Sequence, residues 1–405
     1  MRRLKYCDHW IMGSILVLSI YGIIMIGSAS AGKAAYEGVS FTLMNITKQF
    51  IFVVIGFLLM MFFRGKFHIR FIKRKLVLSY YWFMFILMIA CLAFPSVNGS
   101  HAWIRLGGVM TIQPSEFMKL GLILIVAYYF VEVPKAIDSN PRRYGNKEEF
   151  IRYKRQKCLL EPWGLAFLSM INCAILQRDI GTTAIMLAIF TICFLVVPNP
   201  YYRKIQNILA VLCAIGVIGL LVGGKAISQL DLGVRVARFA SWIDPMSDPY
   251  GASYQQLNGL IAFAKNGLFG AGLGNSTQKF GYIPEAYNDF ITAIIFEECG
   301  IIGMLLLVIG PIGIIIWRLF YYASRIDDSK SRIILCGTAS YFFFHLLLNL
   351  GGVSGLIPMT GVPLLCVSAG GSSTLCAFIT LGFSQAIITS YNRRVQHDAF
   401  YARKN

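Results

Sequence analysis

The chain has 405 residues, of which 57% are hydrophobic and only 14% are charged. Soluble domains carry about a quarter of charged residues, so the composition excludes an ordinary soluble globular protein. The net charge of +18 does not indicate nucleic-acid binding, because the Lys and Arg residues sort by loop as the positive-inside rule predicts. The ten cysteines are scattered without a CxxC pair, which argues against a disulfide framework or a cysteine metal site.

Several stretches exceed the roughly 18 apolar residues that cross a bilayer, and they predict an all-α polytopic membrane protein. Ten spans are expected, at residues 10–30, 48–64, 76–95, 115–132, 161–178, 181–197, 205–223, 290–318, 332–350 and 368–391. Arg2, Arg3 and Lys5 precede the first span, which lacks a convincing cleavage site and is expected to be a retained helix. We interpret residues 1–405 as a single integral membrane domain.

The distribution of basic residues predicts the orientation of these spans. Most Lys and Arg residues fall in alternate loops, which places both termini and the loop 133–160 in the cytoplasm. The large loop 224–289, between the seventh and eighth spans, is then extracellular. The first inner loop, 64–75, is basic and is expected to attract anionic lipid. The loop 133–160 mixes both signs and predicts a solvated loop or a short surface helix, where cytoplasmic partners are candidates to dock.

Polar residues cluster where the fourth span begins. Gln113 and Pro114 precede it, and Pro114 suits the first turn of a helix. Glu116 and Lys119 are therefore expected on one helix face at its outer end. Two interpretations stay open for this pair: a structural ion pair, or a polar wall that faces a substrate cleft. Asp179, in the turn before the sixth span, is either a helix cap or a functional carboxylate.

The loop 224–289 is rich in Gly, Asp, Tyr, Gln and Asn, and loops of this length are uncommon unless they are functional. An apolar stretch at 257–264 predicts a short helix that lies on or dips into the membrane. The Gly-rich run 267–274 lacks the βαβ context of a nucleotide fingerprint, and it predicts a backbone that can approach a ligand closely. Glu297 and Glu298, deeper in the eighth span, are expected to face the protein interior.

The last two spans carry further polar features. His345 and Asn349 are four residues apart, so they share a helix face and are expected to hydrogen-bond between helices. The stretch 351–373 is broken by Gly and Pro. It predicts irregular backbone that lines a cavity or packs within the protein.

Asp289 follows the long loop and lies at the lip of the eighth span. A carboxylate in that position indicates function by default. The sequence shows no evident Ser/His/Asp, Cys/His or metal-ligand set, so a single carboxylate suits general-base activation of a hydroxyl. Nearby cations suit an anionic leaving group such as a pyrophosphate. A transporter with paired broken helices is the competing class, but no internal symmetry supports it.

These residues resemble the SEDS family of bacterial shape, elongation, division and sporulation proteins, the FtsW and RodA group. The resemblance covers nearly the whole chain in the family's order, at residues 103–104, 113–119, 177–182, 244–245, 254–255, 272–279, 284–291 and 349–373. The form of 272–279 is more similar to the division branch, FtsW, than to the elongation branch. The chain departs from the family at Tyr287 and Asn288, where relatives have His-Thr.

The resemblance implies a peptidoglycan glycosyltransferase that polymerises lipid II at the outer face of the bacterial cytoplasmic membrane. It also implies a class B penicillin-binding transpeptidase as partner, beside other division or elongation proteins. Asp289 matches the family's essential acidic residue and is expected to be the general base. The expected substrate-binding residues, whose cations would hold the pyrophosphate, are Arg105, Gln113, Glu116, Lys119, Arg235, Arg238, Lys279 and Glu285. A divalent cation, Mg²⁺ or Mn²⁺, is a further candidate, although the sequence shows no dedicated ligand cage.

Three alternatives remain at this point: an elongation polymerase of the RodA type, a flippase for the same lipid-linked precursor, and a non-catalytic scaffold of the division complex. A flippase needs polar groups through the whole membrane depth, whereas here they crowd the outer end. A scaffold would not need Asp289. Both observations favour the enzyme.

Overall fold

The computed structural model describes residues 6–97, 99–106, 110–139, 146–227, 242, 244–246, 248–251 and 253–402. Its helices are α1 (His9–Glu37), α2 (Val39–Lys66), α3 (Arg74–Ala90), α4 (Pro114–Tyr129), α5 (Glu132–Asp138), α6 (Lys147–Arg155), α7 (Glu161–Ile171), α8 (Ile180–Leu195), α9 (Arg203–Ile227), α11 (Tyr254–Lys265), α12 (Ile291–Met304), α13 (Gly310–Arg325), α14 (Ser329–Val353) and α15 (Gly371–Ala402). One short hairpin pairs β1 (Ile104–Leu106) with β2 (Met110–Ile112), and Arg105 faces Thr111 across it.

Every predicted span overlaps a helix, which confirms the all-α polytopic class. Among the described residues, eight helical stretches are long and apolar enough to cross a membrane, and Ile180–Leu195 is a shorter apolar helix. The eighth predicted span differs from a plain helix. Helical structure runs from Ile291 to Arg325, but Gly300 breaks it with a positive φ of 63°.

The loop 133–160 is largely helical. α4 and α5 form one helical stretch, Pro114–Asp138, and α6 runs through a π-helical turn, Gln156–Leu160, into α7. None of the residues of α6 is buried, so the prediction of a surface helix is confirmed. The short membrane-associated helix expected at 257–264 corresponds to α11, which buries one face against α12 and α14.

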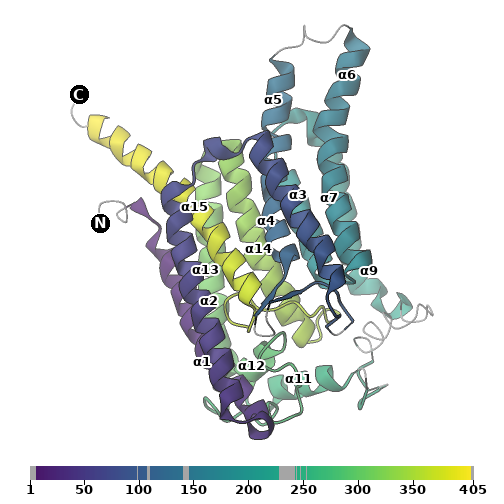
Figure 1. Ribbon diagram of the computed structural model, residues 1–405, viewed down its shortest axis with the longest axis vertical. Helices are drawn as coiled ribbons and strands as arrows, with labels where there is room; N and C mark the ends of the chain where they lie inside the picture. The colour runs from purple at the N-terminus through teal and green to yellow at the C-terminus, as the bar shows by residue number, and fades with distance from the viewer. Residues whose placement is uncertain are drawn as a thin grey trace.

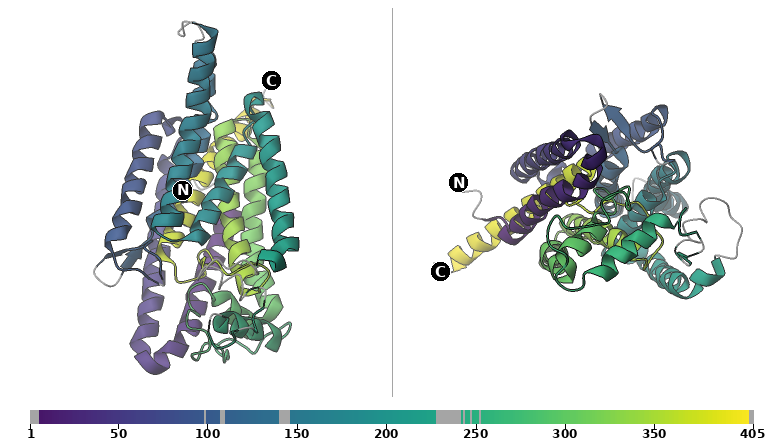
Figure 2. Two further views of the ribbon diagram at one scale, coloured as in Figure 1. Left: turned by 90° about the vertical axis from the view of Figure 1, so that its right-hand side faces the viewer. Right: turned by 90° about the horizontal axis from the view of Figure 1, so that it is seen from below.

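The two ends of the bundle carry different features (Figures 1 and 2). The N-terminus, the C-terminus and the α5–α6 projection lie at one end, whereas α11 and α12 lie at the other. This relative arrangement agrees with the predicted topology. The assignment of the first end to the cytoplasm stays a prediction.

The segment between α14 and α15, residues 354–370, organises the end where α11 lies. A Cβ added to Gly22 on α1 would lie 2.3 Å from the carbonyl oxygen of Cys366. A Cβ on Gly181 of α8 would lie 2.5 Å from that of Thr360. Two glycines therefore let this irregular backbone pack directly against helices, as predicted for non-helical backbone at membrane depth. The segment forms one wall of the candidate site.

Candidate active site

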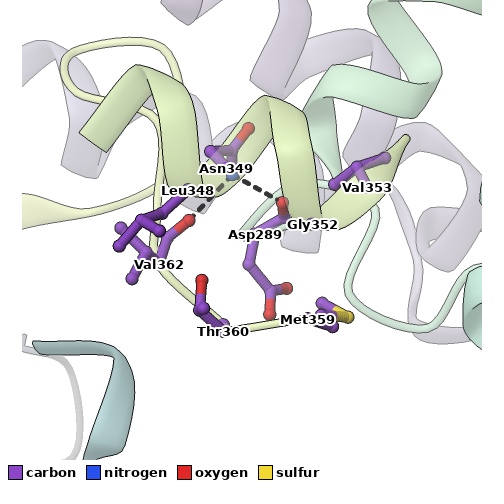
Figure 3. Close-up of a pocket in the computed structure, with 9 residues that line it drawn as sticks. Asp289, Leu348, Asn349, Gly352, Val353, Met359, Thr360 and Val362 are labelled. Carbon is purple, nitrogen blue, oxygen red and sulfur yellow. Dashed lines mark hydrogen bonds between the residues drawn. The ribbon is translucent and has the colours of Figure 1, made fainter. Parts of the chain in front are cut away.

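Asp289 lies in the turn immediately before α12 and points into a small pocket (Figure 3). The pocket is formed by the end of α14 and the segment that follows it. Its lining residues are Asp289, Leu348, Asn349, Gly352, Val353, Met359, Thr360, Gly361 and Val362. The pocket is a shallow, partly open depression, and its empty space of about 150 Å³ includes open solvent.

Asn349 fixes the backbone that carries the carboxylate. Its Nδ2 donates to the carbonyl oxygens of Asp289 and Val362, each at 2.8 Å. Thr292, in the first turn of α12, bonds through Oγ1 to Oδ1 of the same amide. One buried side chain thus joins α12, α14 and the 354–370 segment around the pocket, which confirms the predicted interhelical role of Asn349.

Gly361 allows the pocket wall to approach the carboxylate closely. Its φ of 68° lies in the left-handed region, which glycine adopts without strain. A Cβ at this position would lie 3.5 Å from Oδ2 of Asp289. Any larger side chain would therefore occupy the space in front of that oxygen.

A buried ionic cluster lies behind this wall, between α4 and α14. Lys119 Nζ is 2.7 Å from Oε1 of Glu116 and 3.0 Å from Nε2 of His345. The hydroxyl of Tyr341 donates to Oε2 of Glu116 at 3.0 Å. His345 Nδ1 lies 3.0 Å from the carbonyl oxygen of Pro363. Because a carbonyl can only accept, Nδ1 carries the proton and Nε2 accepts from the lysine.

The burial of this cluster bears on the two interpretations of the Glu116–Lys119 pair. Lys119 is 0% exposed and Glu116 is 1% exposed, so neither side chain forms an open wall of a cleft in this structure. The pair is an interior ion pair linked through His345 to the pocket wall. The expectation of a polar wall is corrected accordingly, because the helix face that the spacing identified packs against α14 rather than against solvent. A direct role in binding substrate stays a prediction.

The sequence model of one protein family, described as cell cycle protein, matches residues 8–393. The chain belongs to the FtsW/RodA/SpoVE family. It is 32% identical to the probable peptidoglycan glycosyltransferase FtsW of Bacillus subtilis, over 94% of this chain and 90% of that protein. It is also 32% identical to the stage V sporulation protein E of the same organism, over 91% of this chain and 93% of the relative.

Solved structures show the same FtsW/RodA fold. The RodA protein of Thermus thermophilus aligns with a TM-score of 0.58 at 22% identity, covering 94% of this chain and 96% of RodA. A chain from a structure described as the structural coordination of polymerization and crosslinking by a peptidoglycan synthase complex aligns with a TM-score of 0.65 at 23% identity. That match covers 95% of this chain and 98% of the other.

Gln113 and Asp179 form a second buried polar contact in this protein. Gln113 Nε2 donates to Oδ2 of Asp179 at 2.9 Å. Asp179 Oδ1 accepts from the backbone N–H of Thr182 at 2.9 Å, which confirms the cap of α8. Burial raises the pKa of the Asp179 carboxyl, while the N–H of Thr182 acts in the opposite direction. The Gln113 side chain is therefore buried and hydrogen-bonded within the protein, and its role in substrate binding stays a prediction.

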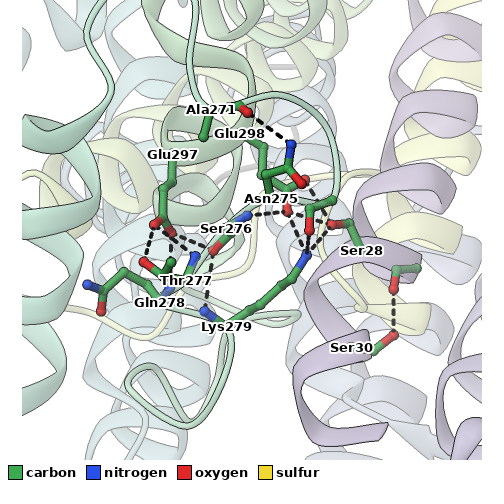
Figure 4. Close-up of polar contacts among 12 residues, drawn as sticks. Ser28, Ser30, Ala271, Asn275, Ser276, Thr277, Gln278, Lys279, Glu297 and Glu298 are labelled. Atoms are coloured by element: carbon green, nitrogen blue, oxygen red, sulfur yellow. Dashed lines mark hydrogen bonds and ion pairs between the residues drawn. The ribbon is translucent and has the colours of Figure 1, made fainter. Parts of the chain in front are cut away.

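Lys279 is buried and bonded within the protein (Figure 4). Its Nζ lies 2.9 Å from Oε1 of Glu298, 3.1 Å from Oγ of Ser28 and 2.6 Å from the carbonyl oxygen of Gly274. This ammonium is paired and buried in this structure, and the expectation that Lys279 holds a pyrophosphate stays a prediction. Glu297, the neighbour of Glu298, accepts from Ser276 and Thr277. Both glutamates face the interior, as predicted.

The other predicted site residues are dispersed. Arg105 is exposed on β1. Glu285 accepts from Asn288 Nδ2 at 2.5 Å, in the turn that leads to Asp289. Arg235 and Arg238 lie outside the residues that the structure describes.

One cation close to this turn was missed by the sequence analysis. Lys33, near the end of α1, lies 5.1 Å from the centroid of the Tyr287 ring and 3.5 Å from its hydroxyl. The only available signal was a lysine near the outer end of a span, and such residues usually anchor the helix at the membrane surface. Tyr287 precedes Asp289 by two residues, so a helix far away in the sequence is brought beside the candidate site.

No set of three or more His, Cys, Asp or Glu side chains in the described ranges is grouped so as to hold a metal ion. The expected divalent cation therefore has no ready-made protein cage among these residues. Its involvement stays a prediction.

Proposed function

We propose that this protein is a peptidoglycan glycosyltransferase of cell division, which polymerises lipid II with Asp289 as general base. The observation that carries the proposal is the position of Asp289. It is a half-buried carboxylate at the start of a membrane-embedded helix, directed into a small, partly open pocket. The similarity to relatives named probable peptidoglycan glycosyltransferase FtsW supports the substrate class and the division branch.

The chemistry follows from the carboxylate. Asp289 takes the proton from the C4 hydroxyl of the acceptor sugar as that oxygen attacks C1 of the donor sugar. The bond from C1 to the pyrophosphate oxygen breaks, and undecaprenyl pyrophosphate leaves with the bonding electron pair. A single displacement inverts the anomeric centre. The Asn349 bond to the Asp289 carbonyl orients the base, because it fixes the turn from which the side chain projects.

The pyrophosphate lies outside the small pocket in this proposal. Arg105 is an exposed candidate to bind it, and Lys33 is a second cation that already faces the turn before Asp289. Lys119 and Lys279 are assigned to buried ion pairs instead. A divalent cation would neutralise the pyrophosphate charge, and among the described residues no group of three or more His, Cys, Asp or Glu side chains would hold it.

The proposed setting is the bacterial cytoplasmic membrane, with both termini in the cytoplasm and Asp289 on the outer side. The proposed partner is a class B penicillin-binding transpeptidase. The similarity in fold to a chain from a peptidoglycan synthase complex supports this choice.

The test is polymerisation of labelled lipid II by the purified protein in proteoliposomes, with and without a transpeptidase partner. Asp289→Asn keeps the shape of the side chain and removes the base, so the rate should fall about 10²–10⁴-fold. Asp138→Asn is the matched control, since Asp138 is an exposed carboxylate on α5, at the opposite end of the bundle. Lipid II that crosses sealed vesicles without being polymerised would support the flippase instead. Normal polymer yield from Asp289→Asn would exclude the base assignment.

A further inference from the structure

The Gly-rich segment 267–274 is built into the break in the α12–α13 span. At Gly300 the helical hydrogen-bond ladder is interrupted. The carbonyl oxygens of Gly267 and Leu268 accept from the N–H groups of Ile301 and Ile302, at 3.3 and 3.1 Å. The loop therefore supplies hydrogen-bond acceptors to the first N–H groups of the helix after the break.

The same segment also donates hydrogen bonds to the end of the helix that precedes the break. The N–H groups of Ala271 and Gly272 donate to the carbonyl oxygens of Glu297 and Glu298, at 2.8 and 2.9 Å. A Cβ on Gly270 would lie 2.3 Å from the Glu298 carbonyl oxygen, so the close approach requires glycine. Figure 4 shows the adjoining contacts, in which Glu297 and Glu298 reach back to residues 276–279.

The depth of this junction can be measured along α1. The hydroxyl of Tyr21 lies 3.3 Å from Sγ of Cys299, next to the break. Tyr21 is about 18 Å along α1 from its first residue, His9, at 1.5 Å per residue. The hydrocarbon core of a bilayer is about 30 Å thick. The break at Gly300, and the loop bonded to it, therefore lie within the depth that α1 spans rather than above the membrane.

Apolar side chains of the segment point away from the protein. Phe269 is 77% exposed, Leu273 is 58% exposed and Leu268 is 56% exposed. Their surface continues along the helical span after the break, because Ile301 of α12, whose N–H bonds to the loop, is exposed, as is Leu306 in the π-helical turn Leu305–Ile309. Exposed backbone at this depth would be unfavourable, but here several of its polar groups are paired with the broken helix.

We propose that the segment 267–274 is a re-entrant membrane anchor. Leu268, Phe269 and Leu273 insert among the acyl chains of the leaflet on the Asp289 side. The anchor is bonded to α12, which begins directly after the turn that carries Asp289, and so it holds that turn at a fixed depth. The contact is with lipid, and it does not depend on the proposed activity.

The test uses site-specific fluorescence on the full-length protein in lipid vesicles. Cys213, the exposed cysteine among those that the structure describes, is replaced by serine. The environment-sensitive dye NBD is then attached at Phe269→Cys or, independently, at Leu273→Cys. Tyr250→Cys is the water-exposed control because Tyr250 is 92% exposed in the same long loop, and Leu306→Cys is the lipid-exposed control.

Dyes at positions 269 and 273 should be quenched by nitroxide-labelled phospholipids, as at position 306, and should resist aqueous iodide. Nitroxides attached along the acyl chains should quench them more than nitroxides at the headgroups, because the break lies about 18 Å along α1 in a hydrocarbon core about 30 Å thick. Iodide quenching equal to that at position 250 would overturn the proposal. A dye that iodide quenches in the protein alone, and that becomes protected only when a transpeptidase is added, would overturn it in favour of a protein-docking surface.

Discussion

Replacing Lys119 by methionine tests the buried ionic cluster most directly. The substitution removes the ammonium that faces Glu116 at 2.7 Å and His345 at 3.0 Å, and it keeps a similar side-chain volume. Glu116 is 1% exposed, so its carboxylate is left buried without its counter-charge. Breaking one side of a buried pair costs about 3–5 kcal/mol, so Lys119→Met should lower the free energy of unfolding by that amount.

The measurement is equilibrium unfolding in mixed micelles, together with the polymerisation rate. The double variant Glu116→Gln/Lys119→Met should recover most of the lost stability, because no unpaired charge remains. Lys154→Met, which breaks an ion pair with the half-exposed Asp138, is the control and should change stability by about 1 kcal/mol or less. Unchanged stability of Lys119→Met, with polymerisation lost, would refute the ion-pair argument and assign Lys119 to substrate binding.

The remaining predictions concern the pocket, the α1 contact and the topology. Asn349→Ala should lower kcat more than it raises KM, because it releases the turn that carries the base; steady-state kinetics on lipid II decides this, and an effect on KM alone would contradict it. Gly32→Val should reduce the yield of folded protein in size-exclusion chromatography, because even a Cβ there lies 1.9 Å from the Lys279 carbonyl oxygen; a normal elution profile would argue against that packing. Cysteine at Tyr250 should react with a membrane-impermeant thiol reagent in cells without an outer barrier, and cysteine at Glu148 only after lysis. The reverse pattern would place the candidate site in the cytoplasm.

The positions of the membrane spans and the place of Asp289 could be predicted from the sequence. A membrane helix satisfies its own backbone groups, so its signal is local: about 20 apolar residues are sufficient to identify it. Asp289 was identifiable for the same reason, because a carboxylate beside such a stretch is conspicuous. The helix caps and polar pairs at helical spacing, such as Asp179 and the His345–Asn349 pair, also follow from local geometry.

The sequence alone did not determine which polar residues meet one another. Spacing placed Glu116 and Lys119 on one helix face, but only packing against α14 decided that this face is interior and that His345 completes the cluster. The pairing of Lys279 with Glu298 likewise follows from tertiary packing and not from a local pattern. Lys33 was not considered until α1 and the turn before Asp289 came together. The partners in these contacts are 19, 226 and 254 positions apart in the chain, and such contacts leave no periodic signal in a single sequence.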